Sequence, residues 1–168
     1  HAIVATGIDG ATWAEPFDTV SACFSKGLGC PVGSIVVGSK KTIFQVHRFR
    51  KQFGGTMRQT GILAGAANYA LDHHLKRIQE DHQHARLLAG GLGSNDGITC
   101  SVENTDTNLV FFDLDTRIGD GSSFCRQLFD EGVLAEAIDP QRVRFVTHLG
   151  VSKIQIEEAL DIVRKLCD

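Results

Sequence analysis

The sequence predicts an α/β fold, and three observations along its 168 residues lead to this expectation. Two β-rich apolar runs near the start are bounded by glycine and proline residues, which is typical of short strands. The middle of the chain places apolar residues at helical spacing over a long stretch. The last third alternates between strand-like and helix-like segments, and this β-α-β-α ending indicates a small α/β domain packed on a larger one.

The first part of the chain is expected to hold a helix end with a loop, two strands and one helix. These elements are expected at residues 1–16, 18–24, 33–38 and 40–52, in that order. Pro16 ends the first segment, because proline breaks regular structure. The last segment is expected to be an amphipathic helix, since Ile43, Phe44 and Val46 lie beside basic residues and Gly54 follows its end.

A single long helix is expected from about residue 59 to about residue 90. Six of its residues form one stripe at helical spacing, namely Leu71, Leu75, Ile78, His82, Ala85 and Leu88. Gly91 and Gly93 then end the helix. Beyond them, strands are expected near 98–102, at 108–114 and at 142–147, and helices at about 121–131 and 152–166.

The last of these helices carries clear local signals. Ser152 is followed three residues later by Gln155, which is the pattern of a capping box at a helix start. The apolar residues of the helix are expected to form one core-facing stripe, made of Ile156, Ala159, Leu160 and Val163.

The composition excludes several classes of protein. Hydrophobic residues make up 42% and charged residues 22% of the chain, which is ordinary for a globular protein with its own core. The net charge of −3 provides no basic field for nucleic acid, and no apolar run is long enough to span a bilayer. Five cysteines without a CxxC pair indicate reduced thiols in a cytoplasmic protein. We expect neither a nucleic acid nor a membrane as partner.

Lys26 is the first candidate for chemistry, because it lies in the glycine-rich turn between the two predicted strands. Such a lysine can hold the aldehyde of pyridoxal 5'-phosphate as a Schiff base, since a rigid, partly desolvated amine loses its proton readily. Gly27 and Gly29 would let a flat cofactor approach the backbone. The alternative is a solvated turn lysine. Cys23 and Cys30 flank the turn and are expected to be small buried hydrophobes.

Arg144 is the second candidate, because an arginine within a short β run is costly to bury without an anion. Its planar guanidinium suits a two-pronged grip on the carboxylate of an amino acid. The alternative is an arginine on an edge strand that points to water, which is our interpretation of Arg142. His148, at the end of the same strand, either orients a carboxylate or caps the strand.

Four histidines along the predicted long helix invite a metal site, namely His73, His74, His82 and His84. No two of them are four residues apart, so they do not share a helical face as metal ligands do, and we expect no metal. His82 is expected in the core and the other three on a solvated face. The chain contains no GxGxxG after a strand, no P-loop and no GxSxG elbow.

Five sequence blocks occur in an order that is more specific than any single block. They read FDTVSACFSKGLGCPVGSIVVGS, RFRKQFGGTMRQTGILAGA, EDHQHARLLA, TNLVFFDL and VRFVTHLGVSKIQIEEAL. Together they resemble the C-terminal half of the low-specificity threonine aldolases, in the aminotransferase-like superfamily of pyridoxal-phosphate enzymes with fold type I. The resemblance implies that residues 1–58 are the C-terminal part of a large cofactor domain. Residues 59–168 would then form a connecting long helix and a small α/β domain.

The resemblance also implies roles for single residues. Lys26 would form the Schiff base with the cofactor, and Arg144 would bind the substrate carboxylate. Lys51 and Arg58 would lie near the cofactor and reach it from a neighbouring subunit, where a cation can meet a phosphate. The family usually has three consecutive glycines between these two cations, whereas this chain has Thr56 in the third place.

The implied activity is a pyridoxal-phosphate-dependent carbon–carbon lyase that cleaves threonine, allo-threonine and related β-hydroxy amino acids to glycine and an aldehyde. The N-terminal half of the subunit would supply the base and the aspartate at the pyridine nitrogen, and the implied assembly is a homotetramer, a dimer of dimers. Two alternatives stay open. One is another enzyme of the same fold, such as an aminotransferase or a β-eliminating lyase. The other is a half that is inactive without its N-terminal partner.

Overall fold

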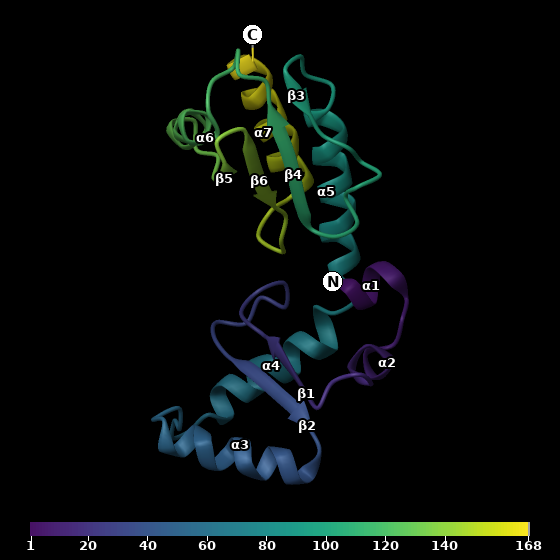
Figure 1. The fold of residues 1–168 in the computed structure, drawn as a ribbon, viewed down its shortest axis with the longest axis vertical. Coiled ribbons are helices and arrows are strands. Elements are labelled where there is room, and N and C mark those ends of the chain that lie inside the picture. The colour runs from purple at the N-terminus through teal and green to yellow at the C-terminus, as the bar shows by residue number, and fades with distance from the viewer. Residues whose placement is uncertain (168) are drawn as a thin grey trace. The chain divides into compact units, whose positions relative to one another are not determined.

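The computed structural model describes residues 1–167, which form two compact units (Figure 1). The N-terminal unit comprises Ala2–Ile78, and the C-terminal unit comprises the residues from Gln79 onward together with His1. The chain is therefore divided between residues 78 and 79, later than the boundary at 58/59 that the sequence suggests. The difference arises because the helix expected to connect the units is interrupted just before this point.

The N-terminal unit combines helices with one antiparallel ribbon of two strands. Its elements are α1 (Ala2–Thr6), α2 (Gly10–Ala14), β1 (Thr19–Cys23), β2 (Ser34–Gly38), α3 (Lys40–Gln52) and α4 (Gly61–His73). The register of the ribbon pairs Thr19 with Gly38 and Cys23 with Ser34. The two strands and α3 confirm the sequence-based expectations.

Residues 1–16 differ from the expected helix end and loop, because they form the two short helices α1 and α2. The side chain of Asp9 caps α2 by accepting a hydrogen bond from the amide of Ala11 at 3.2 Å. Capping of this kind satisfies an amide that a helix start leaves without a partner, so a short helix is stabilised here before Pro16.

The interior of the N-terminal unit is small. Its buried apolar cluster consists of Cys30, Ala67 and Ala70, against which Phe24 and Leu28 pack. All residues of β2 are exposed, and β1 is exposed at every residue except Val20. Both Cys23 and Cys30 were expected to be buried. The burial of Cys30 confirms this expectation, whereas Cys23 is exposed and the expectation is wrong for it. Alternation along a strand buries one face only when a second layer covers that face.

The C-terminal unit is a four-stranded sheet with three helices over the residues that the structure describes. Its elements are α5 (Ile78–Leu92), β3 (Ile98–Thr99), β4 (Leu109–Leu114), α6 (Gly121–Asp130), β5 (Glu136–Asp139), β6 (Arg142–Val146) and α7 (Lys153–Cys167). The sheet order is β3-β4-β6-β5, and all neighbouring strands are antiparallel. The mixed α/β composition confirms the predicted fold class.

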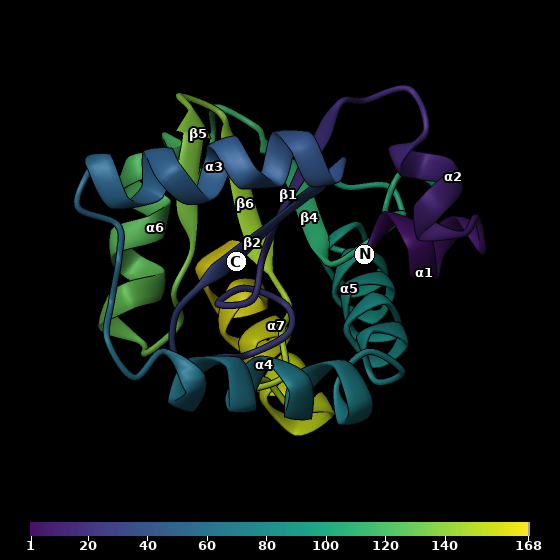
Figure 2. The ribbon, with the colours of Figure 1, turned by 90° about the horizontal axis from the view of Figure 1, so that it is seen from below.

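Helices α5, α6 and α7 cover one face of this sheet, as Figure 2 shows. Val110, Phe112 and Leu114 alternate along β4 and are buried on that face, which is the two-residue period of a half-buried strand. The helices complete the core with Ala85, Leu88, Ala89, Leu92, Phe124, Leu128, Ile156 and Val163. The opposite face of the sheet carries the alternate, partly exposed side chains.

The single long helix expected over residues 59–90 is wrong, because α4 and α5 are separated by a turn at residues 74–77. In this turn the amide of Arg77 donates to the carbonyl of His74 at 3.1 Å, and the amide of Ile78 donates to the carbonyl of Leu75 at 3.4 Å. These three-residue spacings replace the four-residue spacing of an α-helix. No glycine or proline marks the break in the sequence.

The predicted apolar stripe is buried only in its second half. Leu71 and Leu75 are exposed, whereas Ile78, Ala85 and Leu88 are buried. The stripe therefore faces a core only from the start of α5 onward. The helical spacing continues across the turn at residues 74–77, and spacing alone therefore predicted one continuous helix.

Two further differences concern strands. β5 was not expected from the sequence, and β3 spans Ile98–Thr99 rather than 98–102. By contrast, the predicted capping box at the start of α7 is confirmed. The Ser152 amide donates to Oε1 of Gln155 at 2.9 Å, and the Gln155 amide donates to Oγ of Ser152 at 3.3 Å.

Candidate functional site

Lys26 lies in a tight turn between β1 and β2. The Gly29 amide donates to the Lys26 carbonyl at 2.8 Å, and the Cys30 amide donates to the Phe24 carbonyl at 3.0 Å. Gly29 has a φ of 69°, a left-handed conformation that a glycine adopts without strain. The Lys26 side chain is exposed and makes no ion pair within residues 1–167. A fixed backbone thus presents a free primary amine.

Helix α4 holds this turn by two contacts. Nδ1 of His74 lies 2.7 Å from the carbonyl oxygen of Leu28, and Sγ of Cys30 donates to the carbonyl of Ala66 at 3.6 Å. Because a carbonyl only accepts, Nδ1 of His74 carries the proton in this contact. Phe24 and Leu28 also pack on the same helix, so the turn is anchored on both sides of the lysine.

His74 was expected on a solvated face, and its contact with the lysine turn corrects that expectation. The two partners are far apart in the sequence, and nothing in the local pattern relates them. His84 was also expected on the solvated face but is buried, whereas His82 is buried as expected. Burial lowers the pKa of His82, and the charge of Arg86 acts in the same direction.

Lys51 and Arg58 flank a glycine loop in the same unit as Lys26. Lys51 lies in the last turn of α3, Arg58 lies in the turn that follows the loop, and both side chains are exposed. The loop is closed by Arg50, whose Nε donates to the carbonyl of Gly55 at 2.8 Å. Among the described residues, the structure brings neither cation into a hydrogen bond or ion pair with Lys26.

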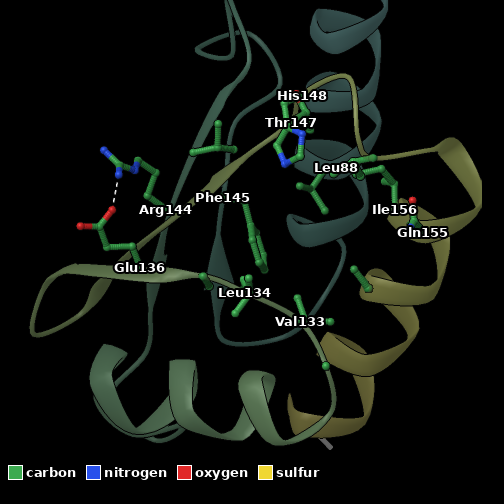
Figure 3. Close-up of a pocket in the computed structure, with 15 residues that line it drawn as sticks. Leu88, Val133, Leu134, Glu136, Arg144, Phe145, Thr147, His148, Gln155 and Ile156 are labelled. Carbon is green, nitrogen blue, oxygen red and sulfur yellow. Dashed lines mark hydrogen bonds and ion pairs between the residues drawn. The ribbon is translucent and has the colours of Figure 1, made fainter. Parts of the chain in front are cut away.

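Arg144 lies on the helix-free face of the C-terminal sheet. It stands opposite Glu136 of β5 and opposite Phe111 of β4. Its Nη2 contacts Oε2 of Glu136 in an ion pair, while its Nε is buried without a hydrogen-bond partner. Figure 3 shows the two charged side chains directed toward each other, with Arg144 on the opposite side of β6 from Phe145. The guanidinium therefore has donors that its neighbours do not use.

Arg142 lies two residues earlier on the same strand and differs in its surroundings. Its Nε lies 3.8 Å from Oδ1 of Asp113, and its guanidinium lies 5.6 Å from the ring centre of Phe111. Its side chain is 50% exposed, against 33% for Arg144. Because β6 lies between β4 and β5, the interpretation of Arg142 as an edge-strand residue is wrong.

A cavity of about 560 Å³ adjoins Arg144 within the C-terminal unit. Its walls are mainly apolar and include Leu88, Val133, Phe145 and Ile156. His148 lies at its edge, and Nδ1 of this exposed residue accepts a hydrogen bond from the Gly150 amide at 3.1 Å. This contact closes the loop after β6, which favours the cap interpretation of His148 over the orientation of a carboxylate.

The described residues contain no group of three histidine, cysteine or acidic side chains that could hold a metal ion. Over the same residues, no helix is both long enough and apolar enough to cross a membrane. Burial raises the pKa of the Cys100 and Cys125 thiols, which keeps them protonated and poorly nucleophilic. The free amine of Lys26 and the under-used guanidinium of Arg144 are therefore the candidate functional groups.

Comparison with known proteins identifies the family. The profile of the beta-eliminating lyases matches residues 1–115. The chain belongs to the beta-eliminating lyase family. Among curated relatives, low-specificity L-threonine aldolase 1 of Arabidopsis thaliana is 36% identical over 95% of this chain and 45% of its own length. The low specificity L-threonine aldolase of Escherichia coli K12 is 39% identical over 94% of this chain and 45% of its own length.

Solved structures show the same fold at lower identity. A candidate aromatic amino acid beta-eliminating lyase/threonine aldolase from Exiguobacterium matches with a TM-score of 0.75, at 18% identity, over 98% of this chain and 49% of that protein. A candidate L-allo-threonine aldolase from Listeria monocytogenes matches with a TM-score of 0.74, at 16% identity, over 98% of this chain and 48% of that protein. These two matches confirm the α/β fold predicted for this chain. The chain spans about half the length of the curated relatives it matches.

Proposed function

We propose that this chain supplies the cofactor-anchoring lysine and the carboxylate-binding arginine of a pyridoxal-phosphate-dependent aldolase. The enzyme would cleave threonine, allo-threonine and related β-hydroxy amino acids to glycine and an aldehyde. The observation that carries the proposal is a free amine on an anchored turn, in a chain that aligns over 94% or more of its length with threonine aldolases. The similarity extends across both compact units.

The residues of the lysine turn fit the cofactor. An anchor must present an unpaired amine from a backbone held by hydrogen bonds, and the turn of Lys26 is bonded at Leu28, Gly29 and Cys30. Within the described residues the amine is exposed, so its desolvation would have to come from the rest of the enzyme and the cofactor. When bound, pyridoxal phosphate supplies an electron sink for the bond that breaks at Cα. Lys26 would hold its aldehyde through Nζ.

Arg144 would bind the carboxylate of the amino acid. Its guanidinium has five donor hydrogens, and the ion pair with Glu136 engages one nitrogen only. A two-pronged contact would fix the direction of the Cα substituents, which is the orientation that bond cleavage requires. Lys51 and Arg58 are proposed as cations for the cofactor phosphate, because the glycine loop between them lets a phosphate approach the backbone.

Further groups would come from outside these residues. Because the chain spans about half of its relatives, we propose that the N-terminal half of the same subunit completes the site and supplies the base. A dimer of dimers, with Lys51 and Arg58 reaching a neighbouring subunit, stays a prediction. The mass of the assembled protein in solution would measure the number of subunits, and cross-linking at Lys51 and Arg58 would test their contact with a neighbouring subunit.

The test uses the whole protein that carries this chain, loaded with pyridoxal phosphate and supplied with threonine. We expect glycine and acetaldehyde in equal amounts. We also expect a visible absorption band that borohydride removes and that Lys26→Ala lacks. Lys40→Ala, an exposed lysine of the same unit, is the matched control and should keep both band and activity. Release of a keto acid or of ammonia without glycine would overturn the aldolase assignment.

A further inference from the structure

Glu136 and Arg144 form an unusual pair for a carboxylate-binding arginine, because the partner is itself a carboxylate. The two residues are directly opposite each other on β5 and β6, so both side chains emerge on the same face of the sheet. The ion pair joins one nitrogen, Nη2 of Arg144, to one oxygen, Oε2 of Glu136. It therefore lacks the two parallel bonds of a fork-to-fork arginine–carboxylate pair.

The arginine and the glutamate differ in how firmly they are held. The side chain of Arg144 is 33% exposed and its Nε is buried, whereas the side chain of Glu136 is 60% exposed. The inner edge of the guanidinium is thus fixed by the protein around it, while the glutamate can swing into water. Breaking an exposed ion pair costs little, because water solvates the released carboxylate.

We propose that Glu136 is an internal competitor for the carboxylate site of Arg144. In the unliganded protein it neutralises the guanidinium and keeps it extended along the sheet face. The carboxylate of the amino acid displaces it, and the strength of this ion pair sets the affinity for the substrate. This inference rests on the proposed function, since it takes Arg144 as the residue that binds the substrate carboxylate.

The neighbouring pair offers a matched control. Arg142 and Asp113 lie on the same face and on adjacent strands, so Asp113→Asn removes one negative charge in the same way as Glu136→Gln. Neither substitution changes the size of the side chain appreciably. A difference between the two variants therefore reports the contact with Arg144 rather than the overall charge of the sheet.

The first measurement is the steady-state cleavage of threonine by the whole cofactor-loaded protein. In Glu136→Gln we expect KM to fall by about twofold to fivefold, the factor that corresponds to an exposed ion pair, with kcat unchanged. Asp113→Asn should leave both constants as they are. An unchanged or raised KM in Glu136→Gln would overturn the inference, and so would an equal fall in both variants.

The second measurement needs no catalysis. Arginine labelled with ¹⁵N gives an Nε–H resonance for Arg144, assigned by its loss in Arg144→Lys, and acetate serves as the probe carboxylate. Acetate should shift this resonance and bind more tightly in Glu136→Gln than in the parent protein. If the protein cleaves no threonine while acetate shows this difference, the proposed function fails and the competition stands. If acetate moves the resonance in neither protein, the competition fails.

Discussion

The two units of this protein hold their candidate functional groups in different ways. The C-terminal unit has a continuous core that draws on three helices and on strands β3, β4 and β6 within the described residues, and Arg144 projects from the outer face of its sheet. The N-terminal unit buries little besides Cys30, Ala67 and Ala70, and Lys26 lies on a turn that this small cluster supports. One site is therefore built on a stable sheet and the other on local hydrogen bonds.

The exposed ribbon of the N-terminal unit shows what this difference means. A two-stranded antiparallel ribbon is marginally stable by itself in water and needs further strands or a covering layer. Apolar side chains of β2 and α3 are exposed, including Val37, Phe44 and Phe49. This exposure agrees with a chain that spans about half of its relatives. The C-terminal unit, by contrast, contains its own core.

The largest expected effect is a loss of stability in the C-terminal unit. Phe112 is 1% exposed and stacks on Phe145 with ring centres 5.4 Å apart. Phe112→Ala should lower the free energy of unfolding of this unit by about 3–5 kcal/mol, because it leaves a cavity in the core. Phe44→Ala removes the same type of side chain from an exposed site on α3. It should change the free energy of unfolding of the N-terminal unit by less than about 0.5 kcal/mol. Hydrogen exchange resolved by residue would measure both.

An equal loss of stability in Phe44→Ala would contradict the comparison. It would show that α3 is covered in the whole protein and that the N-terminal unit gains a core there. The exchange data would then place the added protection on α3 itself.

The second prediction concerns the support of the lysine turn. His74→Ala removes the bond from Nδ1 to the Leu28 carbonyl, so the amides of residues 24–30 should exchange roughly twofold to tenfold faster. His74→Asn keeps a donor at this position and should restore part of the protection. His73→Ala is the control, since His73 is exposed and, like His74, contacts the ring of Tyr69 but does not bond to the lysine turn. Similar exchange in the His73 and His74 variants would show that helix packing, not this bond, supports the turn.

The sequence predicted the elements that local signals define. The basic amphipathic pattern of α3 and the Ser152–Gln155 capping box are complete within a few residues, and both are confirmed. Lys26 and Arg144 were likewise selected from their own surroundings in the sequence. Their roles stay predictions, while their positions on a turn and on a strand are as expected.

The features that the sequence did not predict depend on contacts between distant segments. β5 is short, begins with Glu136 and is stabilised by pairing with β6, so no run of β-branched residues marks it. The pairing of Glu136 with Arg144 follows from that register and could not be predicted before it. The break between α4 and α5 also lies at a long-range contact. The amide of His74 still bonds to Ala70 at the end of α4, while its side chain bonds to the turn near Lys26.

A smaller effect is expected at the start of α7. Ser152→Ala removes the hydroxyl that accepts from the Gln155 amide, and it should destabilise the C-terminal unit by about 1 kcal/mol. Ser122→Ala, at an exposed position inside α6, should change stability by less than about 0.5 kcal/mol. Thermal unfolding monitored by circular dichroism would compare them. A null effect of Ser152→Ala would mean that core contacts of Ile156 and Val163 alone stabilise this helix.

The smallest expected effect is a pH dependence that separates the two units. Burial holds the pKa of His82 below its ordinary value of 6.5, with Arg86 lowering it further and Asp81 opposing the shift. The folded C-terminal unit therefore takes up this proton less readily than the unfolded chain. Well above pH 6.5 His82 is neutral in both the folded and the unfolded state, so its protonation does not lower the free energy of unfolding. As the pH falls below 6.5, the unfolded chain is protonated first, so stability decreases until the pH passes the lowered value.

His82→Gln should remove this part of the decrease and leave the profile above pH 6.5 unchanged. His47→Gln, on the exposed surface of α3, should leave the whole profile as it is. Because His82 lies in the C-terminal unit, the protection factors of amides in β4 and β6, which correct for the intrinsic pH dependence of exchange, should follow the pH while those in β1 and β2 do not. If both units lose protection together, their stabilities are coupled, and the contrast between a self-contained unit and a dependent one would not hold.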